Sequence, residues 1–194
     1  MTKRIIVLLL LVATLTGCDS VKQGLTSTYN IINCEYSYKS ISKLTISGIN
    51  VSNGLSVTNI AKVTSIFSGT ASSIPLDFTL NLNVKNPNQS AAMLHGLQYI
   101  ISIDNIQFTT GSVNQSLNIN AGETQTLPLT IGLDLAELMK NNSKEAVTDI
   151  AKNFLGLGNK ASTVSLQLKP SFLIAGQTVA SPMYIPVSFS FGGN

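Results

Sequence analysis

The side chains that could do chemistry in this chain are few and lie far apart. His95 is the only histidine, and the acidic residues occur singly along the sequence. Zinc sites and acid–base pairs need partners at a defined spacing, and neither that spacing nor a nucleophile elbow nor a phosphate-binding loop occurs. We therefore predict that the protein is not an enzyme and has no catalytic residue, no metal and no cofactor. A hydrolase that uses His95 as its base is the remaining catalytic alternative.

Cys18 stands out because of the residues before it. Lys3 and Arg4 precede an uninterrupted apolar run of nine residues from Ile5 to Ala13, and Leu15-Thr16-Gly17-Cys18 follows. Nine helical residues rise roughly 14 Å, half of a hydrocarbon core of about 30 Å, so the run matches the apolar region of a secretory signal. Leu-Thr-Gly-Cys resembles the lipobox of bacterial lipoproteins. That resemblance implies cleavage before Cys18, a diacylglycerol thioether on its sulfur and an acyl chain such as palmitate on its amine; an ordinary signal peptide with a chance cysteine is the alternative.

The lipobox divides the chain into three parts. Residues 1–17 are interpreted as the lipoprotein signal peptide, 18–39 as the lipid anchor and linker, and 40–194 as the folded domain. The expected location is the bacterial cell envelope, with the membrane as a partner through the lipid on Cys18. Asp19 resembles an inner-membrane retention signal of enterobacterial lipoproteins, a rule that fails in other bacterial groups. The choice between inner and outer membrane, and between periplasmic and surface face, therefore stays open.

Charge is scarce in this chain. Charged residues make up 11% of 194 residues and hydrophobic residues 44%, and removing Lys3 and Arg4 with the signal leaves 10 basic and 9 acidic residues, a net charge of +1. The remaining 177 residues contain no arginine and no tryptophan, and the lysines are scattered. This composition excludes a disordered tail and argues against nucleic acid as a partner.

Cys34 has no partner for an intrachain disulfide, because lipid consumes the only other cysteine. A redox thiol or an intermolecular bridge is one interpretation of Cys34. A small buried hydrophobic residue is the interpretation that the sequence favours.

Alternating hydrophobicity dominates the chain from residue 41 onward. In the clearest stretch, from Ile74 to Val84, apolar residues occupy even positions and polar residues fill the odd ones. A strand with one buried and one exposed face explains this alternation, and Asn86-Pro87-Asn88 ends it because proline cannot donate to a ladder. The same alternation of apolar residues appears at 44–51, where a bulge is predicted at Gly48, and at 97–103, 106–108, 117–119, 127–133, 164–168, 172–174 and 185–191.

Turn residues are expected to separate these strands. Asp104-Asn105 predicts a tight hairpin, and Pro170 is expected to end a strand. Pro182 and Pro186 place the last strand at a sheet edge. Other breaks are predicted at Asn53-Gly54, Gly111-Ser112, Asn120–Glu123 and Ala175–Thr178.

Helical spacing appears in short segments. A helix is predicted from Val57 to Phe67 with a stop at Gly69, and another from Asp134 through Met139. A third runs to Phe154, with Asn142 and Glu145 spaced as in a capping box. A short helix over residues 25–33 is an alternative to a linker there. With seven or eight strands at eight-to-twelve-residue spacing, the fold class is mainly all-β: an antiparallel immunoglobulin/fibronectin-like β-sandwich with one or two added helices.

The stretch from Leu76 to Leu133 resembles a known family. Its motif residues are Asn86-Pro87-Asn88, Gly96-Leu97-x-Tyr99, Gly111 and Ala121-Gly122-Glu123-Thr124, in that order after the long strand. This pattern is similar to the late embryogenesis abundant type 2 family, also called the WHy (water stress and hypersensitive response) domain. Asp104-Asn105 departs from the family, which often has a glycine-containing turn there.

The family resemblance implies a β-sandwich, a link to desiccation or water stress, and no enzymatic activity. It offers no catalytic residue, and its motif residues Asn86, Pro87, Asn88, Gly96 and Tyr99 are expected to build structural turns. The first hypothesis is thus a non-enzymatic, lipid-anchored envelope protein with a binding or stress-protective role. The alternative is a structural or assembly subunit that pairs with an unknown envelope protein through the edge strand at 185–191.

Overall fold

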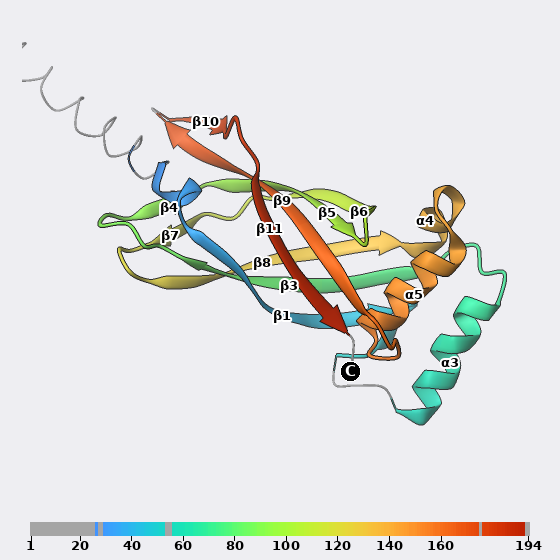
Figure 1. Ribbon diagram of the computed structural model, residues 1–194. Coiled ribbons are helices and arrows are strands. Elements are labelled where there is room, and N and C mark those ends of the chain that lie inside the picture. Colours follow the sequence, from blue (N-terminus) through green and yellow to red (C-terminus); the bar gives the residue numbers. More distant parts are fainter. Residues whose placement is uncertain (1–25, 27–28, 53–55, 175, 193–194) are drawn as a thin grey trace, which may run out of the picture.

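The structure is a computed structural model that describes residues 26, 29–52, 56–174 and 176–192. The predicted signal peptide, Cys18 and the predicted turn at Asn53-Gly54 lie outside the described residues. Two antiparallel sheets pack face to face, with short helices near one end (Figure 1). The predicted antiparallel β-sandwich with a few added helices is confirmed.

Each sheet combines strands that are distant in sequence. The first sheet has the order β2 (Ile49–Asn50), β1 (Glu35–Ile46), β3 (Pro75–Lys85) and β8 (Thr124–Asp134). The second has the order β10 (Gln177–Ala180), β9 (Ala161–Ile174), β5 (Gly96–Ile103) and β6 (Ile106–Val113), and β11 (Ile185–Gly192) also pairs with β9. A small third sheet joins β4 (Ala92–Leu94) to β7 (Leu117–Ile119).

The ladder between β3 and β8 defines the two ends of the sandwich. Lys85 pairs with Thr124 at one end and Pro75 with Asp134 at the other, and eleven residues of strand span about 35 Å. We call the first the amide end, because Asn86 follows β3 there, and the second the helical end, because helices lie there. The first described residues, β4, β7 and β10 lie toward the amide end (Figure 1).

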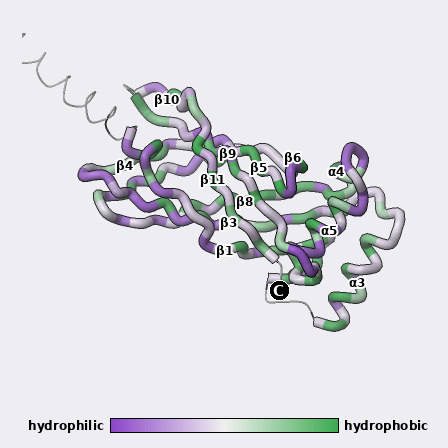
Figure 2. The backbone as a smooth tube through the Cα atoms, viewed as in Figure 1, coloured by the Kyte–Doolittle hydropathy of each residue, from purple (hydrophilic) through white to green (hydrophobic). Residues whose placement is uncertain are grey.

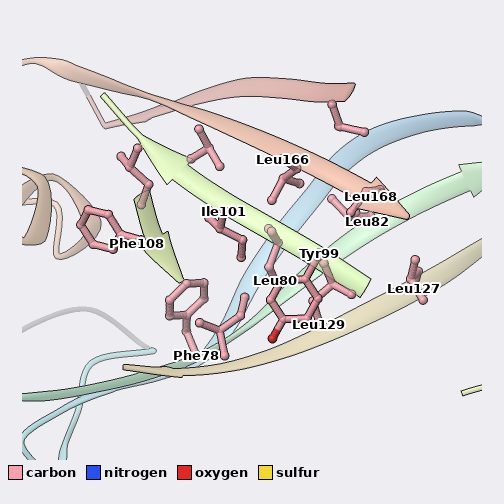
Figure 3. Packing of buried hydrophobic residues seen from close by; sticks show 14 of the residues in the cluster. Phe78, Leu80, Leu82, Tyr99, Ile101, Phe108, Leu127, Leu129, Leu166 and Leu168 are labelled. Atoms are coloured by element: carbon pink, nitrogen blue, oxygen red, sulfur yellow. The ribbon is translucent and has the colours of Figure 1, made fainter. Parts of the chain in front are cut away.

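The core fills the space between the two sheets. The alternation predicted for β3 holds, since its even residues from Leu76 to Val84 are buried. Hydrophobic and hydrophilic residues alternate along the strands in Figure 2. Figure 3 shows side chains from both sheets meeting in the middle. Those labelled there are Phe78, Leu80, Leu82, Leu127 and Leu129 from the first sheet, and Tyr99, Ile101, Phe108, Leu166 and Leu168 from the second.

β1 differs from the prediction at both of its ends. It begins at Glu35, inside the segment interpreted as linker, because Glu35 pairs with Lys85 and their side chains form an ion pair of 3.1 Å. The bulge predicted at Gly48 is wrong. Ile46 pairs with Ile49, so Ser47 and Gly48 form a two-residue hairpin with φ of 46° and 78°, as a type I′ turn requires.

Pro170 does not end a strand, contrary to the prediction, because β9 runs through it from Ala161 to Ile174. The Pro170 oxygen accepts a hydrogen bond from Ser181 N, so this residue's backbone polar groups point away from β5. On that side β11 pairs with β9 up to Leu168 and β10 starts at Ser171. The missing amide hydrogen of Pro170 thus falls in the gap between two partner strands and costs no ladder bond.

Gly111 is also not a break, since β6 continues to Val113 and Gly111 pairs with Tyr99. The predicted turns at Asp104-Asn105 and Asn120–Glu123 are confirmed. Asp104 and Asn105 have φ of 49° and 67° between β5 and β6, and these two residue types tolerate the left-handed conformation better than most.

Three labelled helices follow the predicted segments closely. α3 (Val57–Ser68) begins after Ser56 and ends at Gly69, and α4 (Leu135–Asn141) begins after Asp134, as predicted. α5 (Lys144–Phe154) is capped by Ser143, whose Oγ accepts from Ala146 N. The predicted cap at Asn142 is wrong, because its amide donates to the Leu138 oxygen instead.

α5 closes the helical end with aromatic contacts. Phe154 packs on Phe78 and Phe191, with ring centroids 5.1 and 4.2 Å away. Residues 29–32 are helical, within the segment for which a short helix was the alternative. No helix in the described ranges is long and apolar enough to cross a membrane.

Candidate functional site

Asn86 is a polar residue whose side chain is completely buried. Its Nδ2 donates to the backbone oxygens of Ser90, Ile119 and Asn120 at 2.9 to 3.2 Å. Its Oδ1 accepts from Asn88 N at 3.0 Å and from Asn88 Nδ2 at 2.8 Å. Buried amides stabilise a fold when donors and acceptors are both satisfied. Asn86 therefore fastens its own turn to the β7–β8 connection.

Backbone bonds complete this fastening. Asn86 N donates to the Glu123 oxygen, and Gly122 N donates to the Asn86 oxygen, both at 2.9 Å. Gly122 has a φ of 75°, a conformation that favours glycine. Two of the sequence motifs, Asn86-Pro87-Asn88 and Ala121-Gly122-Glu123, thus meet in space.

Asn30 extends the network to the start of the described chain. Asn88 Nδ2 donates to the Asn30 oxygen at 3.1 Å, and Asn30 Nδ2 donates to Ser90 Oγ at 2.8 Å and to the Ala91 oxygen at 3.0 Å. Asn30 is buried. Sequence reasoning missed this residue because no local pattern relates side chains that are about 60 positions apart.

Tyr99 and Gly111 form a second motif contact. A Cβ at Gly111 would overlap the Tyr99 ring and hydroxyl, so only glycine leaves room for the tyrosine. The Tyr99 hydroxyl donates to the Thr130 oxygen of the opposite sheet at 3.3 Å, and burial raises its pKa. A Cβ at Gly96 would lie 3.3 Å from the Val113 oxygen. Pro87 is exposed. These contacts give the motif residues structural roles.

His95 lies in the short connection between β4 and β5. Its Nδ1 is 3.4 Å from Ser116 Oγ, and its backbone N donates to the Ser171 oxygen. A catalytic serine that uses histidine as its base needs a third group to orient the imidazole. Among the hydrogen bonds of the described residues, no carboxylate contacts His95. The backbone of His95 thus joins the β4–β5 connection to β9, and the contacts of its ring do not orient Ser116 as a nucleophile.

Cys34 is buried beside Tyr36 at the start of β1. Burial, reinforced by the charge of Glu35, raises the pKa of the Cys34 thiol to about 11. A thiol with such a pKa stays protonated at neutral pH and is a poor nucleophile. Tyr36 donates its hydroxyl proton to the Ile31 oxygen at 2.8 Å, and burial raises its pKa as well. Cys34 therefore acts as a small apolar residue of the core.

A cavity of about 830 Å³ opens at the helical end between α3 and α5. Its apolar lining comes from Ile60, Val63, Phe67, Ile106 and Ile150, and its polar lining includes Asp104, Asp149, Lys152 and Asn153. Sequence reasoning did not foresee it, because it forms between segments distant in the chain.

Several polar groups of this cavity have partners within the protein. Asp104 Oδ1 accepts from Thr163 N at 2.8 Å, and Asn153 Nδ2 donates to Ser162 Oγ at 2.7 Å. Lys152 lies 4.0 Å from Asp149. Over the ranges that the structure describes, no group of three His, Cys, Asp or Glu side chains could hold a metal ion. The hydrogen bonds described in this cavity therefore hold α5 and the β5–β6 turn against β9.

Comparison with known proteins points to one family. Residues 81–168 match the family model described as late embryogenesis abundant protein. No curated protein sequence matches the chain.

The chain is also similar, at low sequence identity, to several solved structures. An Archaeoglobus fulgidus protein is 15% identical, with 79% of this chain and 97% of that chain covered and a TM-score of 0.37. An Arabidopsis thaliana protein is 11% identical, with 80% and 78% covered and a TM-score of 0.45. A structure described as a late embryogenesis abundant protein is 12% identical, with 93% and 83% covered and a TM-score of 0.35. The part of this chain that is similar to the late embryogenesis abundant family is residues 81–168, which begin within β3, end within β9 and include Asn86, Gly96 and Tyr99.

Proposed function

We propose that this chain is a non-enzymatic, lipid-anchored protein of the bacterial cell envelope with a stress-protective role. The observation that carries the proposal is the match of residues 81–168 to the late embryogenesis abundant family. The sequence Leu15-Thr16-Gly17-Cys18 supports anchoring through lipid on Cys18. The motif residues of the matched segment are engaged in holding turns together, which favours a scaffold over a catalyst.

The exposed polar side chains suggest how such a domain would tolerate loss of water. On the outer face of the first sheet, Asn81 Nδ2 donates to Ser40 Oγ at 3.2 Å and to Ser42 Oγ at 3.0 Å. Lys39 Nζ likewise donates to Thr126 Oγ1 at 2.7 Å. Polar groups that already have protein partners lose fewer hydrogen bonds when water is withdrawn. The fold is therefore expected to persist on drying.

A gene deletion tests the protective role directly. We expect the deletion strain to survive drying and osmotic shock less well than the parent, and the wild-type gene to restore survival. Equal survival of both strains would remove the proposed role.

A separate test addresses the anchor. Intact mass should show two or three acyl chains on Cys18, and Cys18→Ser should move the protein from the membrane fraction to the soluble fraction. If the wild-type protein carries no lipid, the proposed anchor is wrong. The survival experiment would still test the protective role independently.

The edge strand β11 supports the alternative function, an assembly subunit. Within the described residues β11 pairs on one side only, with β9. Pro186, at its start, and the stacking of Phe189 on Tyr38 at 4.5 Å limit how much of the edge is open to a partner. Strand addition would use the remaining outward backbone groups near Ser190.

Substitution of Ser190 by proline separates the two functions. It should remove an envelope protein from the native complex if strand addition operates, while Val57→Pro on α3 serves as a control at a distant exposed site. An unchanged native complex in the Ser190 variant would eliminate the assembly alternative.

A further inference from the structure

The large apolar side chains that stay exposed are concentrated at the amide end. Val57 lies on α3 at the helical end, and Tyr38 stacks on Phe189. The other large apolar residues exposed in the described ranges are Tyr29 (67%), Met93 (46%), Leu173 (47%), Val179 (44%), Met183 (58%) and Tyr184 (43%). Exposed apolar clusters on soluble domains mark interaction surfaces.

The hairpin of β9 and β10 extends beyond the cover of the first sheet. All four residues of β10 are exposed. Val179 pairs with Phe172, and Thr178 pairs with Leu173, so Val179 and Leu173 point to opposite faces of the hairpin. Apolar side chains on both faces of one hairpin cannot all turn toward the protein core. The hairpin therefore leaves Leu173 and Val179 exposed, and Figure 1 shows β10 at the margin of the sandwich.

Charge is absent from this whole region of the chain. Residues 170–192 contain no Asp, Glu, Lys or Arg. The residue before this stretch is Lys169, whose Nζ lies 5.4 Å from the centroid of the Tyr184 ring. Leucine and valine at a tip, with tyrosine and lysine behind them, follow the order of side chains found from hydrocarbon to headgroup in a bilayer.

The anchor would emerge at the same end. Asn30 is bonded to Ser90 and Ala91 beside β4, and the residue after β4, His95, bonds to Ser171 at the base of the hairpin. Eleven residues lie between Cys18 and Asn30, and the twelve steps from one Cα atom to the other reach at most about 40 Å when extended. A tether this short keeps the hairpin at an effective concentration in the millimolar range near the bilayer, so a weak contact is well populated.

We propose that the β9–β10 hairpin, with Met183 and Tyr184, docks into the lipid surface and turns the amide end toward the membrane. This inference rests on the proposed lipid anchor at Cys18. The occupant is the bilayer itself, because the tether brings it within reach and residues 170–184 carry no charge that would oppose burial among lipids.

The absence of tryptophan from the chain makes a direct test practical. Leu173→Trp places a single fluorophore at the hairpin, Val179→Trp does so on its other face, and Val57→Trp provides an exposed control at the helical end. The full lipidated protein is reconstituted into phosphatidylethanolamine–phosphatidylglycerol vesicles, with and without acyl chains carrying bromine as quencher. We expect a shift to shorter wavelength and quenching at 173 and 179, and no change at 57.

The outcomes separate this inference from the anchor. Protein that floats with the vesicles while all three tryptophans keep a water-like emission confirms anchoring and overturns hairpin docking. Protein that fails to float overturns both proposals. An emission shift at 173 in native envelope membranes, with none in protein-free vesicles, assigns the hairpin to a protein partner and overturns the lipid proposal.

Discussion

The two ends of the sandwich are built from different materials. At the amide end, residues 86–96 and 170–184 contain no Asp, Glu, Lys or Arg, and a buried amide joins the turns. At the helical end, residues 134–160 contain eight charged side chains. There, surface carboxylates and hydroxyls cap α4 and α5. The same ladder of β3 and β8 connects the two ends.

This difference separates two ways of finishing a strand. A buried amide does not ionise, and all of its donors and acceptors need hydrogen-bond partners. Losing one of these partners therefore lowers the free energy of unfolding strongly, by an amount that does not depend on pH. An exposed cap contributes less and depends on ionisation and on salt. The amide end is therefore expected to set the stability of the fold, and the helical end to set its response to pH.

Asn86→Asp should give the largest effect. The substitution removes the Nδ2 donor from three backbone oxygens and sets a buried carboxylate against them. The loss of unfolding free energy at pH 7 is expected to be about 4 kcal/mol, measured by urea denaturation. Asn118→Asp makes the same chemical change at an exposed site in β7 and should cost less than about 0.5 kcal/mol. Equal effects of the two would break the comparison.

Gly111→Ala tests close packing between Tyr99 and β6. The added Cβ would overlap the Tyr99 ring, and displacing that ring is expected to cost about 2 to 3 kcal/mol. In a Tyr99→Leu background the same change should cost under about 1 kcal/mol, because leucine has no atoms at the point of overlap. A cost that is the same in both backgrounds would place the strain in the backbone.

Much of the fold could be predicted from the sequence where a strand has one buried and one exposed face. The alternation from Ile74 to Val84 fixed β3, and the pair Asp104-Asn105 fixed a hairpin. Strand breaks predicted at proline and glycine were wrong where the residue's role depends on a neighbouring strand or side chain. Pro170 sits in a gap between β10 and β11, and Gly111 makes room for Tyr99.

The candidate sites were predicted less completely than the fold. The motif around Asn86 was visible in the sequence, but its bonds to Asn30 and Ile119 join positions far apart in the chain. The exposed hairpin at Leu173 was missed for a similar reason: apolar alternation shows that a strand has a hydrophobic face and does not show whether another element covers it.

Asp134→Ala should have the next largest effect, at the opposite end of the same ladder. Desolvation raises the pKa of the Asp134 carboxyl, but hydrogen bonds from Ser73, Ile74, Ala136 and Glu137 outweigh it, and the net pKa is lowered. Loss of the α4 cap and of the bond from Ile74 N at 2.8 Å is expected to cost about 2 kcal/mol at pH 7.

The pH dependence of this effect has a definite sign. A carboxyl whose pKa is lower in the folded state stabilises the protein above its unfolded pKa, and that contribution disappears as pH falls through the folded value. The difference between wild type and Asp134→Asn should therefore shrink on acidification below about pH 4. The hydrogen bonds of the Asn86 side chain go to backbone groups and to the Asn88 amide, and none goes to a carboxyl group. Asn86→Ala should therefore cost the same at pH 7 and pH 4. A pH-independent Asp134 effect would contradict the distinction between the two ends.

Ser143→Ala should have the smallest effect and sharpens the comparison most. Ser143 Oγ accepts from Ala146 N at 3.3 Å and donates to Glu145 at 2.8 Å. Loss of this cap is expected to cost about 1 kcal/mol, and Ser143→Asp should retain most of the stability. Ser143 shares no hydrogen-bond partner with Gly111, so the two alanine variants should add within about 0.5 kcal/mol if the sandwich unfolds as one unit. If the helical end unfolds separately, urea denaturation will show two transitions. Ser143→Ala will then shift only the earlier one, and Gly111→Ala will leave that transition unchanged, because each residue stabilises only its own part of the molecule.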